Sequence, residues 1–220
     1  GIDIRLSSDF DQTREKWIDK PMAMVTATHI SPDGERVAIT ARGQVFVAPK
    51  KYGRLVEASR KAGVRYRDAR FMPGDDGANL LTLSDQSGEV ELWMLPANGV
   101  GDASQLSTGA EVLRWEAVPS PDGKLIAHHD KNLKLWVFDV ATKTSKQIDE
   151  NPLENFADLR WSPDSRWLAY SSWAPNMNQI VKLYDADEPP PVDEVVNQIR
   201  PILSKHFKPA LLARMTIIPY

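Results

Sequence analysis

The sequence predicts an all-β fold: a partial β-propeller of about four blades of four antiparallel strands, with a short α-helical C-terminal tail. A turn phrase occurs four times, and its aspartates stand at positions 33, 75, 122 and 164, at intervals of 42, 47 and 42 residues. Apolar segments rich in β-branched and aromatic residues follow the copies. A repeat period in the forties with strand-like units is typical of a propeller with one blade per repeat.

The turn phrase has a physical basis. In its first copy, residues 31–34, Pro32 presets the backbone, Asp33 can bond to nearby backbone N–H groups, and Gly34 accepts a positive φ. Further copies stand at residues 120–123 and 162–165, with a degenerate one at 72–75. The four aspartates are therefore interpreted as turn residues and not as paired catalytic carboxylates, because an active site would not recur in every blade.

Each repeat is expected to supply one blade. In the first repeat, strands are predicted at residues 24–30, 36–41, 44–48 and 54–58. In the last repeat, the first strand ends at Trp161, and strands are predicted at residues 166–173 and 179–184. The segment where its fourth strand should follow leads instead into the prolines at 189–191, so this blade is expected to have three strands.

The chain is divided into three parts. Residues 1–21 are predicted to be a linker or a strand of a preceding domain, and residues 22–186 the partial propeller. Residues 187–220 are predicted to be a helical tail, because apolar residues recur at helical spacing after the prolines. The helix is expected over residues 192–206, with a kink at Pro201. Because the chain starts at Gly1, we expect it to be part of a longer reading frame.

Composition disfavours several classes of partner. The net charge of −3 predicts no nucleic-acid partner, and the lack of a long apolar run predicts no membrane partner. The absence of cysteine excludes disulfides, thiolate nucleophiles and cysteine-bound metals. We expect a cytoplasmic location, with the periplasm as the alternative.

The sequence predicts no catalytic, cofactor-binding or metal-binding residue, and no cofactor. His128 and His129 are adjacent on a predicted strand and should point to opposite faces, so they cannot hold one metal together. These two, with His29 and His206, are interpreted as structural or solvent-facing imidazoles. No Gly-x-Ser-x-Gly or phosphate-binding loop occurs.

Two further groups of residues receive structural interpretations. Four tryptophans are taken to lie at equivalent strand positions and to pack between blades: Trp93, Trp136, Trp161 and Trp167. A basic run is interpreted as a solvated face and not as a binding patch: Arg60, Lys61, Arg65, Arg67 and Arg70.

Longer phrases resemble a known family. Residues 8–17, 40–49, 95–99 and 158–170, in this order, are similar to the second propeller of tricorn-type proteases, and the turn phrase to the blades of TolB-like propellers. The resemblance covers about residues 2–186. It implies a parent serine peptidase of large oligomeric form that degrades peptides, in which propellers filter and channel substrates and products. The catalytic residues and the PDZ module of that family lie further along the parent chain and have no counterparts here.

The tail resembles a different family. Residues 199–220 look like part of the second ATPase module of Clp-type AAA+ unfoldases, particularly the type VI secretion subgroup. Arg214 matches the arginine finger of that family, which stabilises charge on a transferring phosphoryl group. The Walker elements that hold ATP are missing, so the tail is interpreted as a fragment joined to an unrelated propeller.

The sequence thus favours a non-catalytic propeller fragment of a tricorn-type serine protease, which gates or channels peptides and scaffolds a homo-oligomeric assembly. The alternatives are a free-standing TolB-like binding module and an accessory fragment of an AAA+ unfoldase. Whether the chain has an enzymatic activity of its own stays open, since only the parent is expected to be a peptidase.

Overall fold

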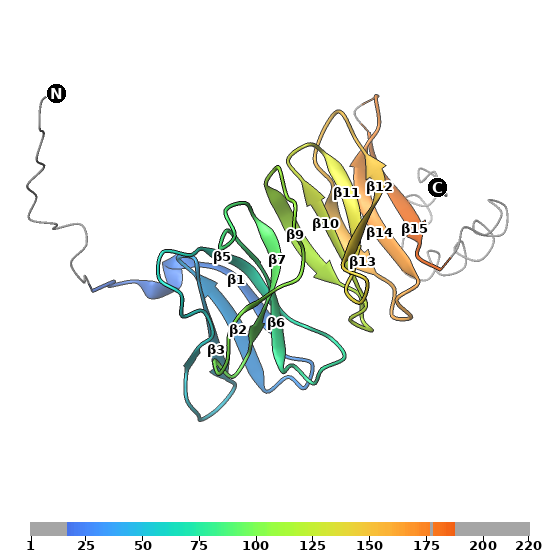
Figure 1. The fold of residues 1–220 in the computed structure, drawn as a ribbon. Coiled ribbons are helices and arrows are strands. Elements are labelled where there is room, and N and C mark those ends of the chain that lie inside the picture. The colour runs from blue at the N-terminus through green and yellow to red at the C-terminus, as the bar shows by residue number, and fades with distance from the viewer. Residues whose placement is uncertain (1–16, 177, 188–220) are drawn as a thin grey trace, which may run out of the picture.

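The computed structural model describes residues 17–176 and 178–187, which form four antiparallel sheets in the order of the chain (Figure 1). The first blade follows a 3-10 turn at Pro21–Met24. Its strands are β1 (Val25–Ile30), β2 (Arg36–Ala41), β3 (Gln44–Pro49) and β4 (Val56–Glu57). The predicted strands are confirmed here to within about two residues at most ends, and β4 is shorter than expected.

The other three blades repeat this pattern. The second has β5 (Tyr66–Phe71), β6 (Asn79–Ser84), β7 (Glu91–Pro96) and β8 (Ser104–Gln105). The third has β9 (Arg114–Pro119), β10 (Leu125–Asp130), β11 (Lys134–Asp139) and β12 (Thr144–Glu150). The fourth has β13 (Ala157–Trp161), β14 (Trp167–Trp173) and β15 (Gln179–Asp185). Over the described residues, three blades of four strands and one of three strands confirm the predicted all-β partial propeller.

Successive blades pack face to face through three apolar clusters. Strand alternation sends neighbouring residues to opposite faces, so Leu80 belongs to the cluster between blades one and two, and Leu81 to the next one. The third cluster, between blades three and four, contains Leu135, Leu159 and Leu168. Burying a leucine side chain contributes about 1.5–3 kcal/mol, so these interfaces carry much of the folding free energy.

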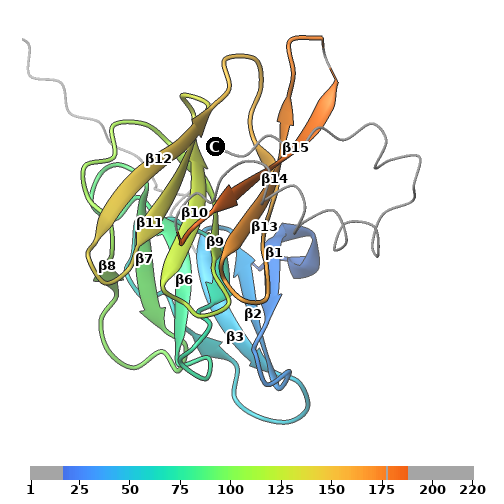
Figure 2. The same cartoon turned by 90° about the vertical axis from the view of Figure 1, so that its right-hand side faces the viewer.

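The described blades form a row and not a closed ring. Figure 1 places the first and last blades at opposite ends of the molecule, and Figure 2 looks at the molecule from the side of the last blade. On the outer face of the first blade, Ile30 is 64% exposed, and Val37 and Ile39 are only half-buried. This apolar face corresponds to faces that other blades bury against a neighbour.

The turn interpretation of the aspartates is confirmed by their hydrogen bonds. Asp33 accepts the backbone N–H of Glu35 at 3.0 Å and the hydroxyl of Ser31, which is itself buried. The Ser31 hydroxyl lowers the pKa of Asp33 below its usual value. Asp122 and Asp164 make the same pair of contacts, and Asp75 accepts three backbone N–H groups in the degenerate copy.

Several predictions lie wholly or partly outside the described residues: the linker or strand over residues 1–21, the helix at 192–206, His206 and Arg214. In the described part of the chain, no helix has the length and apolar character needed to span a membrane.

Candidate functional site

The first strand of each blade carries an unusual backbone feature. Each of these strands contains a β-bulge, and in blades two to four a residue at the bulge has a positive φ: 48° at Asp68, 40° at Glu116 and 55° at Asp158. Non-glycine residues rarely adopt this conformation, and bulges re-aim side chains next to functional sites. All three are acidic, so the innermost strands of blades two to four each present a carboxylate at an equivalent position, whereas the bulge of β1 holds Thr26.

Arg70 joins two of these carboxylates across a blade boundary. Its guanidinium lies 3.0 Å from Asp68 Oδ2 on the same strand and 3.3 Å from Glu116 Oε1 on the innermost strand of the next blade. All three side chains are between 20% and 29% exposed, so this network remains in contact with solvent. The network therefore places fixed charges of both signs on the innermost strands, where they remain open to solvent.

His29 occupies the innermost strand of the first blade, at the position equivalent to Arg70. Its Nδ1 atom accepts the backbone N–H of Phe71 at 3.2 Å, so it links blade one to blade two. Burial, assisted by Arg70, lowers the pKa of His29. This favours the structural interpretation of the imidazole.

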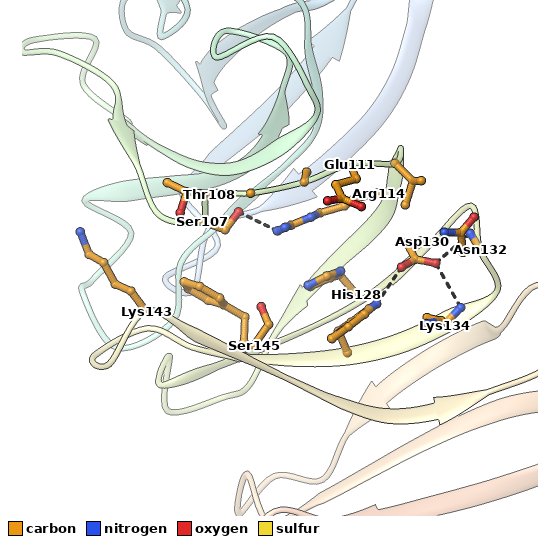
Figure 3. Close-up of a pocket in the computed structure, with 15 residues that line it drawn as sticks. Ser107, Thr108, Glu111, Arg114, His128, Asp130, Asn132, Lys134, Lys143 and Ser145 are labelled. Atoms are coloured by element: carbon orange, nitrogen blue, oxygen red, sulfur yellow. Dashed lines mark hydrogen bonds between the residues drawn. The ribbon is translucent and has the colours of Figure 1, made fainter.

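A second candidate site is a cavity of about 410 Å³ between the segment 107–112 and the third blade (Figure 3). Figure 3 shows Arg114 directed at Ser107, with His128 below it and Asp130 beyond. Asp130 accepts the indole N–H of Trp136 at 2.8 Å and the backbone N–H of Asn132 at 2.8 Å. Its carboxylate therefore fixes the third blade's own hairpin.

A buried ion pair lies behind this cavity. Arg114 Nη1 is 3.1 Å from Glu91 Oε2, and both side chains are at most 11% exposed. The Ser107 hydroxyl donates to Glu91 and accepts from Arg114 at 2.7 Å and from the Leu92 backbone N–H at 2.9 Å. Ser107 thus uses its donor and both acceptor positions in structure, which leaves it no free hydrogen-bonding capacity for nucleophilic chemistry.

His128 and His129 are both buried, with 2% and 7% exposure, so the solvent-facing alternative is wrong for this pair. Neither ring nitrogen of His128 has a hydrogen-bond partner, and burial lowers its pKa to about 3. Nδ1 of His129 also lacks a partner, and burial lowers its pKa. Both rings are therefore neutral at pH 7. Among the described residues, no group of three histidine, aspartate or glutamate side chains could hold a metal ion.

The equivalence assumed for the four tryptophans is wrong. Trp93 and Trp136 share the third strand of their blades, but Trp161 ends the first strand and Trp167 begins the second strand of the fourth blade. Trp161 does pack between blades, with its indole N–H donating to the Val118 carbonyl at 3.0 Å. Trp167 instead lies under the Arg166 guanidinium, 4.8 Å from it. The error arose because tryptophan alone does not mark strand register.

The interpretation of the basic run as one solvated face is wrong in part. Arg60, Lys61 and Arg65 are exposed as expected. Arg67 and Arg70 are half-buried instead, because their positions on β5 bring them against the third blade. Arg67 stacks over Trp115 at 5.0 Å, and Arg70 bonds Glu116.

The acidic residues of the innermost strands did not emerge from the sequence interpretation. Asp68, Glu116 and Asp158 differ in type and lie in dissimilar local phrases, so no motif marks them. Their spacing was the available signal, since each lies five residues before the proline of the next turn: Pro73, Pro121 and Pro163.

The fold and the innermost strands define the chain as a propeller of the kind found in tricorn and TolB proteins. The family description "Tricorn protease second beta propeller domain" matches residues 25–206, so the chain belongs to that family. The match runs beyond the predicted boundary at residue 186 into the tail, and the comparisons lend the Clp-type resemblance no support.

Curated relatives agree with the family. The chain is 27% identical over 187 residues to a tricorn protease homolog of Saccharolobus solfataricus, covering 84% of this chain and 16% of the relative. It is also 27% identical over 183 residues to a putative tricorn-like protease C-terminal subunit of Sulfurisphaera tokodaii, covering 83% of this chain and 20% of the relative. The chain thus spans about a fifth or less of the length of these relatives.

Solved structures show the same fold. The crystal structure of the tricorn protease superposes with a TM-score of 0.63 at 16% identity, covering 76% of this chain and 16% of that one. TolB from Acinetobacter baumannii gives a TM-score of 0.60 at 22% identity, covering 73% of this chain and 40% of that one.

Proposed function

We propose that this chain is a non-catalytic propeller segment of a tricorn-type serine peptidase, which gates or channels peptides and scaffolds a homo-oligomeric, cytoplasmic assembly. The observation that carries the proposal is the network of Asp68, Arg70 and Glu116 on the innermost strands. Propeller blades surround a central channel, and innermost strands form its wall. Membership of the tricorn family supplies peptides as the molecules to be passed.

The proposal is tested by locating bound peptide on the full chain. A peptide carrying a photoreactive benzophenone residue is irradiated with the protein, and mass spectrometry maps the cross-links. We expect them in residues 66–71 and 114–119. Arg70→Gln should lower their yield about threefold or more, whereas Lys50→Gln, which removes an exposed charge paired with Glu35, should leave it unchanged. Cross-links confined to the outer strand at residues 144–150 would contradict a channel role.

The chain on its own is expected to hydrolyse no peptide. Ser107, one of the two serines that line the 410 Å³ cavity, has a fully engaged hydroxyl, and His128 in the same lining is buried and neutral. A set of fluorogenic peptides provides the measurement. Turnover that disappears when a serine of this chain is replaced would show that the chain is itself a peptidase.

The free-standing TolB-like binding module is the alternative, favoured by the structural likeness to TolB. Reading the source gene on both sides of the chain separates the two candidates, since a PDZ module and a catalytic serine downstream would decide for the protease. The AAA+ alternative rests on Arg214, outside the described residues, and the family match extends over part of the same tail.

A further inference from the structure

A cavity of about 690 Å³ lies between the first and second blades, at the ends where their innermost strands begin. Three arginines from separate segments line it: Arg42 in the turn between β2 and β3, Arg65 just before β5, and Arg67 on β5. The basic run identified in the sequence contained only Arg65 and Arg67, because Arg42 lies 18 residues before its first residue, Arg60. The blade-to-blade packing therefore gathers positive charge that the linear sequence does not show.

Three other arginines of the described chain have acidic partners, which these three guanidinium groups lack. Arg70, Arg114 and Arg166 each form an ion pair with a carboxylate. Over residues 17–176 and 178–187, no such pair involves the three arginines of the cavity.

Among the described residues, one carboxylate lines the cavity and another bonds the backbone of Arg65, and both are already engaged. Asp68 lines the cavity, but its carboxylate binds Arg70. Asp85 accepts the backbone N–H of Arg65 at 2.9 Å and does not pair with its side chain. Arg60 and Lys61, on the connection that leads to Arg65, add exposed positive charge. The cavity thus keeps an excess of positive charge that an anionic ligand can neutralise.

The pocket is partly pre-organised. Arg67 is held by stacking on Trp115, and the backbone of Arg65 is held by Asp85. Gly43 has φ of +81°, and a Cβ there would lie 3.0 Å from Cγ of Arg65, so glycine lets the turn carrying Arg42 approach the Arg65 side chain. A ligand that finds its partners already positioned loses less conformational entropy on binding.

We propose that this pocket binds the carboxylates of acidic peptide segments. Guanidinium groups form bidentate, charge-assisted hydrogen bonds with carboxylates, and a cavity of this volume accommodates several side chains. That the ligand is a peptide rests on the proposed function, since the pocket borders Asp68 on the innermost strand. It would capture acidic segments at the mouth of the channel, before they pass along the innermost strands.

The test compares two fluorescein-labelled hexapeptides, one containing four glutamates and the other four glutamines in their place. Anisotropy titration with the full chain should give at least tenfold tighter binding of the glutamate peptide at 50 mM salt, weakening as salt rises. Arg42→Gln and Arg65→Gln should each weaken that binding about fivefold. Lys124→Gln removes one exposed charge at the opposite end of the blades and should change nothing.

Three results would overturn the proposal: equal binding of the two peptides, unchanged binding in both arginine variants, or tighter binding of a single-stranded DNA 12-mer than of the glutamate peptide. Cross-links of an uncharged peptide to residues 66–71 would then still support the channel. Conversely, glutamate-selective binding without cross-links on the innermost strands would support the anion-binding pocket and refute the channel role.

Discussion

Replacing Glu91 by glutamine is expected to lower the free energy of unfolding by about 3–5 kcal/mol. The variant leaves the guanidinium of Arg114 buried without its counter-charge, 3.1 Å from a neutral amide. Burial already lowers the pKa of Arg114, and Glu91 is the first of the groups that oppose this effect. The amide also cannot accept at both oxygen positions, where the carboxylate now accepts the Ser107 hydroxyl and the Ala110 backbone N–H.

Urea denaturation followed by tryptophan fluorescence measures the effect. The matched control is Glu35→Gln, because Glu35 pairs with Lys50 on the surface, where both side chains are more than half exposed. Surface pairs contribute at most about 1 kcal/mol, so the control should unfold within that margin of the wild type. Equal destabilisation in the two variants would mean that the buried pair gains nothing from its location.

The blades could be predicted from the sequence because their signals are local. The Ser-Pro-Asp-Gly phrase fixes its turn through contacts within five residues, as between Ser31 and Arg36, and strand alternation follows from the same stretch. The repeat period was then enough to predict a propeller, because this prediction needs no information about contacts between blades.

The candidate sites could not be predicted in the same way, since they arise between blades. Arg42 and Arg67 meet only because blade two packs on blade one, and the partners of Arg70 include a glutamate 46 residues away. The bulge in β5 that gives Asp68 a positive φ depends on the pairing of β5 with β6, and no residue type in the sequence predicts this bulge. The burial of both His128 and His129 was equally hidden, because a blade in the middle of the row is covered on both faces.

Replacing His128 by leucine is expected to stabilise the protein by about 1 kcal/mol at pH 7, although the residue is buried. Neither nitrogen of the ring has a hydrogen-bond partner, so folding removes both from water without compensation. Leucine has a similar volume and no polar atom to desolvate. The control is His29→Leu, which should destabilise, because Nδ1 of His29 accepts the backbone N–H of Phe71 and its loss leaves that donor unpaired.

His128→Leu should also make the free energy of unfolding less dependent on pH. The pKa of His128 is about 3 in the folded protein, against 6.5 for a free side chain, so only the unfolded chain takes up its proton between these values. The contribution of the neutral His128 to the free energy of unfolding is therefore fully present above pH 6.5 and is lost as pH falls toward 3. Between pH 7 and pH 4 the loss from this residue is about 3 kcal/mol. Urea midpoints at pH 7, 5.5 and 4 measure the slope. In His128→Leu, the change of the free energy of unfolding with pH should be only the part that His29, His129 and the carboxylates contribute. A pH slope equal to that of the wild type would show that His128 gains a proton in the folded state.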